Sequence, residues 1–184
     1  MRRLILTISM FALISAIAAC GSITKGGSAP ASAASRVSSS PTPRVALSAQ
    51  AVILKLKADV PSISISVVYT AATDPNFELG RPGGYTSKAA FVDSRINPST
   101  VSDSSTGSVA LGGGVEVFPS NTEAMQRAHY IQSVTAGSLA LTEYDYVAGG
   151  VVLRLSSSYT PAEAQKFASS LSSITGVKAV AVTS

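Results

Sequence analysis

Cysteine, histidine and tryptophan are almost absent from this chain of 184 residues, which contains Cys20, His129 and no tryptophan. A single cysteine excludes an intrachain disulfide, so the fold must depend on burial of apolar surface, for which about 140 residues suffice. A structural zinc site usually needs several His or Cys ligands, and a Ser-His-Asp triad would depend on His129 alone. We therefore predict no catalytic residue, no metal and no cofactor, and interpret His129 as an ordinary helix residue.

The basic excess does not indicate a nucleic-acid-binding surface, although the formal net charge is +4. From Val45 onward there are nine Lys or Arg and ten Asp or Glu, so this part is nearly neutral. Nucleic-acid binding needs a clustered basic surface that displaces phosphate counterions. Gly112-Gly113-Gly114 is not followed by the Lys and Ser/Thr of a phosphate-binding loop. We expect no nucleic-acid partner.

The first 20 residues have the order of a signal peptide. Arg2 and Arg3 precede an apolar run over 4–17, which is shorter than the roughly 20 residues of a membrane span. Ile17-Ala18-Ala19-Cys20 resembles the lipobox of bacterial lipoproteins. The resemblance implies removal of residues 1–19, a diacylglyceryl group on Cys20 and attachment to the extracytoplasmic face of the cell membrane. The alternative is an ordinary secretory peptide that is cleaved after Ala18.

Residues 20–44 contain the lipid-carrying Cys20 and a stretch rich in Ser, Ala, Gly and Pro. This stretch has too little apolar surface to offset the entropy of ordering the chain. It is either a bare spacer or a stalk that carries O-linked sugars. We therefore predict a disordered tether over 20–44 and a single globular domain over 45–184.

The pattern from residue 45 onward predicts an α+β fold. Capping residues indicate helices, and alternating apolar residues indicate strands. The short connections favour antiparallel pairing, so we expect a two-layer sandwich with a mostly antiparallel sheet and helices on one face. The expected elements are a helix over 48–58 (or a strand at 54–57), strands over 63–69, 88–95 and 114–118, a helix over 120–135, strands over 142–147 and 150–156, a helix over 160–176 and a strand or tail over 177–183.

The loop over 73–88 is the best candidate for ligand recognition, because loops on a rigid scaffold often carry binding residues. Its candidate ligand-binding residues are Asp74, Asn76, Glu78, Arg81 and Tyr85. The alternative is a structural loop in which Arg81 pairs with Asp93 or Glu116 and Tyr85 caps the core.

Two carboxyl patterns raise other possibilities. Residues 74–78 resemble the start of a calcium loop, but Leu79 and Tyr85 occupy the positions of its glycine and bidentate glutamate, so a turn is favoured. Glu143 and Asp145 lie about 7 Å apart on one strand face. Carboxylates of a glycosidase must flank a sugar, which neighbours on one strand rarely can. We expect both on the solvated face of a hairpin, with Thr142, Tyr144 and Tyr146 inward.

Several short segments resemble a group of actinobacterial secreted lipoproteins without an established activity. The segments are 79–88, 91–93, 115–118 and 143–146. The resemblance implies lipidation and an extracytoplasmic location, and it supplies no catalytic residue. Our first hypothesis is a tethered envelope domain that binds a small-molecule ligand or an envelope protein. The alternatives are a small hydrolase acting on cell-wall or lipid material and a structural envelope component.

Overall fold

The computed structural model describes residues 47–138 and 141–183, which belong to a unit spanning Pro43–Ser184. The predicted signal peptide, Cys20 and the tether over 20–44 lie outside the described residues. Within the described ranges, no helix is long and apolar enough to cross a membrane.

Within the described residues, three α-helices and a six-stranded antiparallel sheet form the domain, which confirms the predicted α+β class. The sheet order is β1-β2-β3-β5-β4-β6. Two short 3₁₀ helices, η1 and η2, lie between β2 and β3. The elements are α1 (Ala49–Asp59), β1 (Ile63–Val68), β2 (Ser87–Asp93), η1 (Pro98–Thr100), η2 (Val109–Leu111), β3 (Gly112–Val117), α2 (Asn121–Thr135), β4 (Glu143–Ala148), β5 (Val151–Ser156), α3 (Pro161–Thr175) and β6 (Val180–Val182).

Side-chain caps set the starts of the three helices. The Ser48 side chain accepts a hydrogen bond from the amide of Ala51, which fixes the segment over 49–59 as a helix instead of a strand. Ser120 caps α2 through the amide of Glu123, and Thr160 with Glu163 forms a full capping box at α3. Caps that use neighbouring residues are readable from sequence, and all three helices begin where the sequence predicted.

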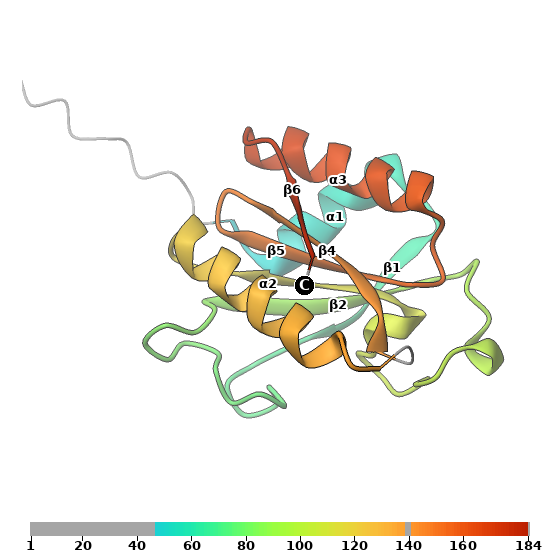
Figure 1. Ribbon diagram of the computed structural model, residues 1–184, viewed down its shortest axis with the longest axis horizontal. Coiled ribbons are helices and arrows are strands. Elements are labelled where there is room, and N and C mark those ends of the chain that lie inside the picture. The colour runs from blue at the N-terminus through green and yellow to red at the C-terminus, as the bar shows by residue number, and fades with distance from the viewer. Residues whose placement is uncertain (1–46, 139–140, 184) are drawn as a thin grey trace, which may run out of the picture. The chain divides into compact units, whose positions relative to one another are not determined.

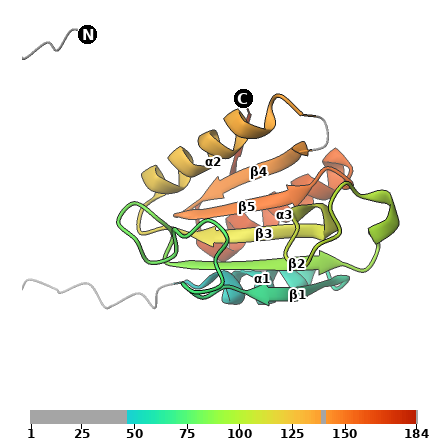
Figure 2. The same ribbon diagram turned by 90° about the horizontal axis from the view of Figure 1, so that it is seen from below.

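Helices cover both faces of the sheet (Figures 1 and 2). The sequence predicted helices on one face; α1 and α3 meet this expectation, whereas α2 packs on the opposite face. The larger core lies under α1 and α3, where Phe91 of β2 stacks on Phe167 of α3 with ring centroids 5.9 Å apart. The smaller core lies under α2, where Ala124, Ala128 and Ile131 pack with Val147 and Val152 among others.

Glycine at two neighbouring positions of β3 shapes the two faces differently. A Cβ at Gly113 would collide with the ring of Phe91 and with the carbonyl of Arg154, so only glycine fits there. A Cβ at Gly114 would point to the α2 face, where its nearest neighbour is the carbonyl oxygen of Ala89 at 3.7 Å. Gly114 thus adds no side chain above the middle of this sheet face, and a Cβ there would meet no close contact.

α2 covers the part of this face formed by β4, β5 and β6, and two loops flank the rest. Figure 2 shows the loop between β1 and β2 and the loop between β2 and β3 on either side of the strands. The space between the loops and α2 is where the charged side chains of the sheet gather.

Candidate functional site

Five charged side chains lie on the α2 face of four adjacent strands. Lys88 pairs across the ladder with Glu116, and Arg154 pairs with Asp145. Glu143 precedes Asp145 by two residues and so shares its face. Charges removed from water are costly unless they are paired, so this face requires partners for each of them.

Asp74 is the partner that attaches the β1–β2 loop to the sheet. Its carboxylate is 1% exposed and accepts hydrogen bonds from Tyr85 Oη at 2.6 Å and Lys88 Nζ at 3.1 Å. It also accepts hydrogen bonds from the backbone amides of Asn76, Glu78 and Leu79. Burial alone would raise the pKa of Asp74, but the hydrogen bonds from Tyr85, the Glu78 amide and Lys88 outweigh it and lower the pKa to about 2.

Arg127 attaches α2 to the same charged face. Its guanidinium donates from Nε to Glu116 Oε2 at 2.8 Å and from Nη2 to Glu116 Oε1 at 3.3 Å. Glu116 also lies 3.7 Å from Lys88 Nζ, and Arg127 Nη1 lies 3.6 Å from Glu78 Oε2. The Asn76 side-chain amide finds partners for both its oxygen and its nitrogen in one of its two orientations. In that orientation its oxygen accepts hydrogen bonds from Lys88 Nζ and Arg127 Nη2. Each of these charged side chains of the loop, β2, β3 and α2 therefore has a partner of opposite charge.

The structure separates the five loop residues that the sequence proposed as ligand-binding. Asp74 and Tyr85 are buried in the network, and Glu78 is half-buried beside Arg127. Arg81 is exposed, and the predicted pairing of Arg81 with Asp93 or Glu116 is wrong, because Asp93 pairs with Arg95 and Glu116 with Arg127 and Lys88. Of the five, Asn76 lines a pocket.

The expectation for Glu143 and Asp145 is wrong in one respect. They share a strand face as predicted, but that face is enclosed by α2 and the loops instead of being solvated. Arg154, 21% exposed, donates from Nε and Nη2 to the two oxygens of Glu143, each at 2.9 Å. Burial disfavours the charged form of Arg154, but the Glu143 carboxylate more than offsets this and raises its pKa. Tyr144 and Tyr146 face the larger core as expected, whereas Thr142 is exposed.

Asp145 lies deeper than Glu143 and lacks a full set of donors. Its Oδ2 accepts from Gln132 Nε2 at 2.9 Å, while its buried Oδ1 has no hydrogen-bond partner among the described residues. Burial and the neighbouring Glu143 carboxylate raise the pKa of Asp145 to about 7, in spite of the Gln132 hydrogen bond and the Arg154 charge. The neutral acid is therefore the favoured form of Asp145 below neutral pH.

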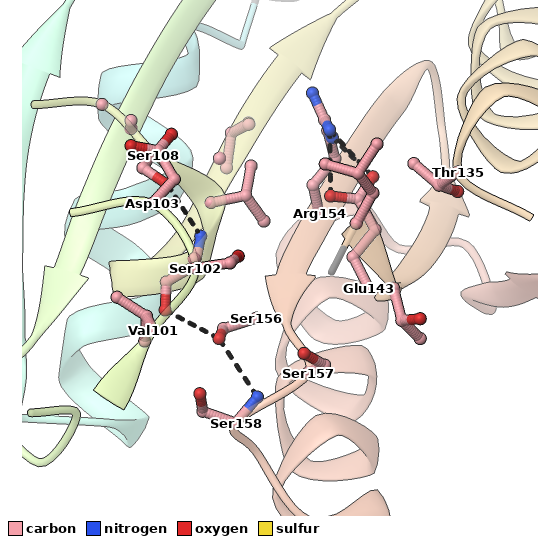
Figure 3. A pocket seen from close by; sticks show the side chains of 18 of the residues that line it. Val101, Ser102, Asp103, Ser108, Thr135, Glu143, Arg154, Ser156, Ser157 and Ser158 are labelled. Carbon is pink, nitrogen blue, oxygen red and sulfur yellow. Dashed lines mark hydrogen bonds and ion pairs between the residues drawn. The ribbon is translucent and has the colours of Figure 1, made fainter. Parts of the chain in front are cut away.

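A pocket of about 450 Å³ opens above Gly114 and the Arg154–Glu143 pair. Figure 3 shows Arg154 and Glu143 on one side of it, Ser102, Asp103 and Ser108 across from them, and Ser156–Ser158 at one end. Lys88, Glu116 and Ala90 complete the floor, and Tyr69, Asn76, Thr135 and Leu141 stand at its margins. Pockets of a few hundred Å³ with a few converging polar groups are typical of small-molecule sites.

Sequence reasoning missed most of this pocket. Arg154 interrupts the apolar strand Val151-Val152-Leu153-Arg154-Leu155, and such an unmatched charge was the available signal for a buried partner. The serine-rich segment over 97–108 contains no motif that indicates a site, and yet Val101, Ser102 and Asp103 line the pocket. His129 is exposed on α2 and does not line it.

Comparison with known proteins adds no family: the chain matches no family model, no curated protein and no solved structure. The functional argument therefore depends on the geometry of the pocket.

The Asp145→Asn variant should flatten part of the pH dependence of stability. The pKa of an Asp in the unfolded chain is about 3.9, whereas folded Asp145 has a pKa of about 7. Between these values the folded state retains a proton that the unfolded chain has released, so stability falls as pH rises. Asp145 should lower the free energy of unfolding by up to about 1.4 kcal/mol for each pH unit of increase between about pH 4.5 and 6.5.

Urea denaturation of both proteins at several pH values in that window measures the difference. The exposed Asp103 supplies a control, because its pKa is lowered mainly by the Ser105 amide and it stays ionised throughout the window. Asp103→Asn should keep the wild-type slope. Parallel pH profiles for the wild type and Asp145→Asn would show that Asp145 is ionised in the folded protein.

Proposed function

We propose that this domain binds a small molecule in the pocket above Gly114 and Arg154, as the tethered part of a lipid-anchored envelope protein. The observation that carries the proposal is the Arg154–Glu143 pair at the pocket wall. Lys88 and Glu116 are occupied by neighbours on several sides, whereas Arg154 has only Glu143 as a hydrogen-bond partner among the described residues. A polar pair that lines a pocket and keeps unused hydrogen-bonding groups suits a ligand site.

Binding is favoured over hydrolysis by the state of the pocket hydroxyls. Ser156 Oγ donates to the carbonyl of Ala110 at 2.8 Å and accepts from the amide of Ser158, so it is held as a structural group. The histidine that could act as a base is exposed on α2, outside the pocket lining. A nucleophile needs an adjacent base to become reactive at neutral pH.

The pocket is tested by closing it. Gly114→Val places a branched side chain in the open space above the strand and suits a β-strand backbone. The protein for the test is the mature chain from residue 20 with Cys20→Ser, which carries no lipid. A dialysable extract of bacterial envelopes should shift the amide resonance of Gly114 and its neighbours in the unsubstituted pocket.

Gly114→Val should abolish the shifts around the pocket, while Ala58→Val, an exposed substitution on α1, should retain them. Identical shifts in the open and closed pockets would refute the pocket as the binding site, as would an extract that perturbs no pocket residue.

The membrane anchor is a separate part of the proposal and depends on Cys20. Two acyl chains give stable membrane attachment. Intact mass of the mature protein should show diacylglycerol on Cys20 and loss of residues 1–19. Cys20→Ala should leave the signal peptide uncleaved or release the protein from the membrane. Normal processing together with unchanged membrane retention in that variant would contradict the anchor.

A further inference from the structure

We infer that the pocket ligand is a neutral polyhydroxylated molecule, a sugar or a polyol, held through neighbouring hydroxyls by Arg154 and Glu143. The inference rests on the proposed ligand-binding function and assigns the chemical class of its ligand. Three features support it: the unused hydrogen-bonding capacity of the pair, the charge balance of the pocket, and the hydroxyl groups on its walls.

The Arg154–Glu143 pair has unused donors beside unused acceptors. A guanidinium carries five N–H donors, and Arg154 uses Nε and Nη2 on Glu143, which leaves Nη1 without an acceptor among the described residues. Each carboxylate oxygen of Glu143 keeps a further lone pair. A hydroxyl donates and accepts at once, so two adjacent hydroxyls can accept from Arg154 and donate to Glu143 without breaking the ion pair.

The balance of charge disfavours an ionic ligand. The lining contains the cations Lys88 and Arg154 and the carboxylates Asp103, Glu116 and Glu143, a net charge of −1, and Asp103 accepts a hydrogen bond from the amide of Ser105. An anion bound at Arg154 would lie against Glu143, and Lys88 is already occupied by Asp74 and Glu116. A cation bound at Glu143 would lie against Arg154. Like charges at such short range weaken binding, so a neutral polar ligand fits best.

Hydroxyl side chains surround the pair from separate segments of the chain. The hydroxyls of Thr142, Ser157 and Ser158 have no hydrogen-bond partner among the described residues and stand at the pocket. Figure 3 places Ser157 and Ser158 at the end of the pocket nearest Glu143, with Ser102 and Ser108 across from the pair. Such groups can donate to or accept from ring hydroxyls in several orientations.

Beside the Lys88–Glu116 pair, one patch of the pocket floor suits the flat apolar surface of a sugar ring. Gly114 and Ala90 present almost no side chain, and Tyr69 is half-buried at the margin, with Lys88 Nζ 5.0 Å from the centre of its ring. An anionic or metal-ion site would have no need of this smooth surface. The arrangement therefore combines polar groups with one small apolar patch of the floor, at Ala90 and Gly114.

The test compares neutral rings with their charged forms on the mature chain carrying Cys20→Ser. Glucose, galactose, mannose and inositol are the neutral probes, glucuronate and galacturonate the anionic ones, and glucosamine and galactosamine the cationic ones. Titrations followed by calorimetry and by the Gly114 amide resonance should show at least one neutral probe binding tenfold or more tighter than its charged forms. Gly114→Val should weaken this binding at least tenfold.

Two further variants distinguish the contribution of the Arg154–Glu143 pair to binding from that of the pocket shape. Glu143→Gln keeps the size of the side chain but removes a charged acceptor, and it should weaken neutral-probe binding tenfold or more. Ser157→Ala, at an exposed hydroxyl, should weaken it only a few-fold and leave stability unchanged. Thermal unfolding of each variant identifies any loss that comes from misfolding.

The outcomes distinguish this inference from the proposed function. Tighter binding of an acidic or amino sugar, or binding of none of the neutral probes, would overturn the ligand class. If an envelope extract still shifts the Gly114 amide resonance in that case, the binding function stands. Failure of both the probes and the extract to affect the pocket would overturn the two together.

Discussion

The charged face of the sheet is the constraint on which the rest of the structure depends. The α2 face of the sheet cannot be covered by apolar packing alone, because unpaired charges would lose their hydration without compensation. This face carries Lys88, Glu116, Arg154, Glu143 and Asp145. The loop and α2 therefore supply the counter-charges Asp74 and Arg127 at the positions where they cover the face. Removing one partner of such a buried pair usually costs several kcal/mol, as the remaining charge stays buried.

This constraint assigns different roles to the two loops. The loop between β1 and β2 is held from beneath by Asp74, whose bonds to the amides on either side of Phe77 keep that residue at φ 56°, a backbone conformation that bulky side chains rarely adopt. It acts mainly as a scaffold and forms one margin of the pocket through Asn76. The segment after β2 instead places polar side chains opposite Arg154, where they remain accessible to a ligand.

The sequence predicted the parts of the fold that depend on neighbouring residues. Ser48, Ser120 and Thr160 cap the helices at the predicted starts, and Gly149 and Gly150, with φ 57° and 85°, form the turn between the two strands predicted over 142–147 and 150–156. The alternation in β4 correctly placed Glu143 and Asp145 on one face. What it could not supply was the environment of that face, because a charged strand face is usually solvated and only tertiary contacts show otherwise.

The candidate site escaped sequence reasoning for the same reason. Asp74 and Lys88 are 14 residues apart, and Arg127 and Glu116 are 11 apart, in different elements with no shared local pattern. The pocket depends on Gly114 and on serines from two further segments, which in sequence are indistinguishable from ordinary strand and loop residues. Pairing across a sheet is a property of the assembled topology, so such contacts appear only when the strand order is known.

The stability of Tyr85→Phe beside that of Arg81→Ala tests the scaffold account most directly. Tyr85 is fully buried and donates to Asp74, so removal of its hydroxyl leaves a buried carboxylate with one donor fewer. The account predicts a loss of roughly 1–3 kcal/mol in the free energy of unfolding for Tyr85→Phe. It predicts a change within about 0.5 kcal/mol for Arg81→Ala, because that side chain is exposed. Unchanged stability of Tyr85→Phe together with marked destabilisation by Arg81→Ala would contradict the account.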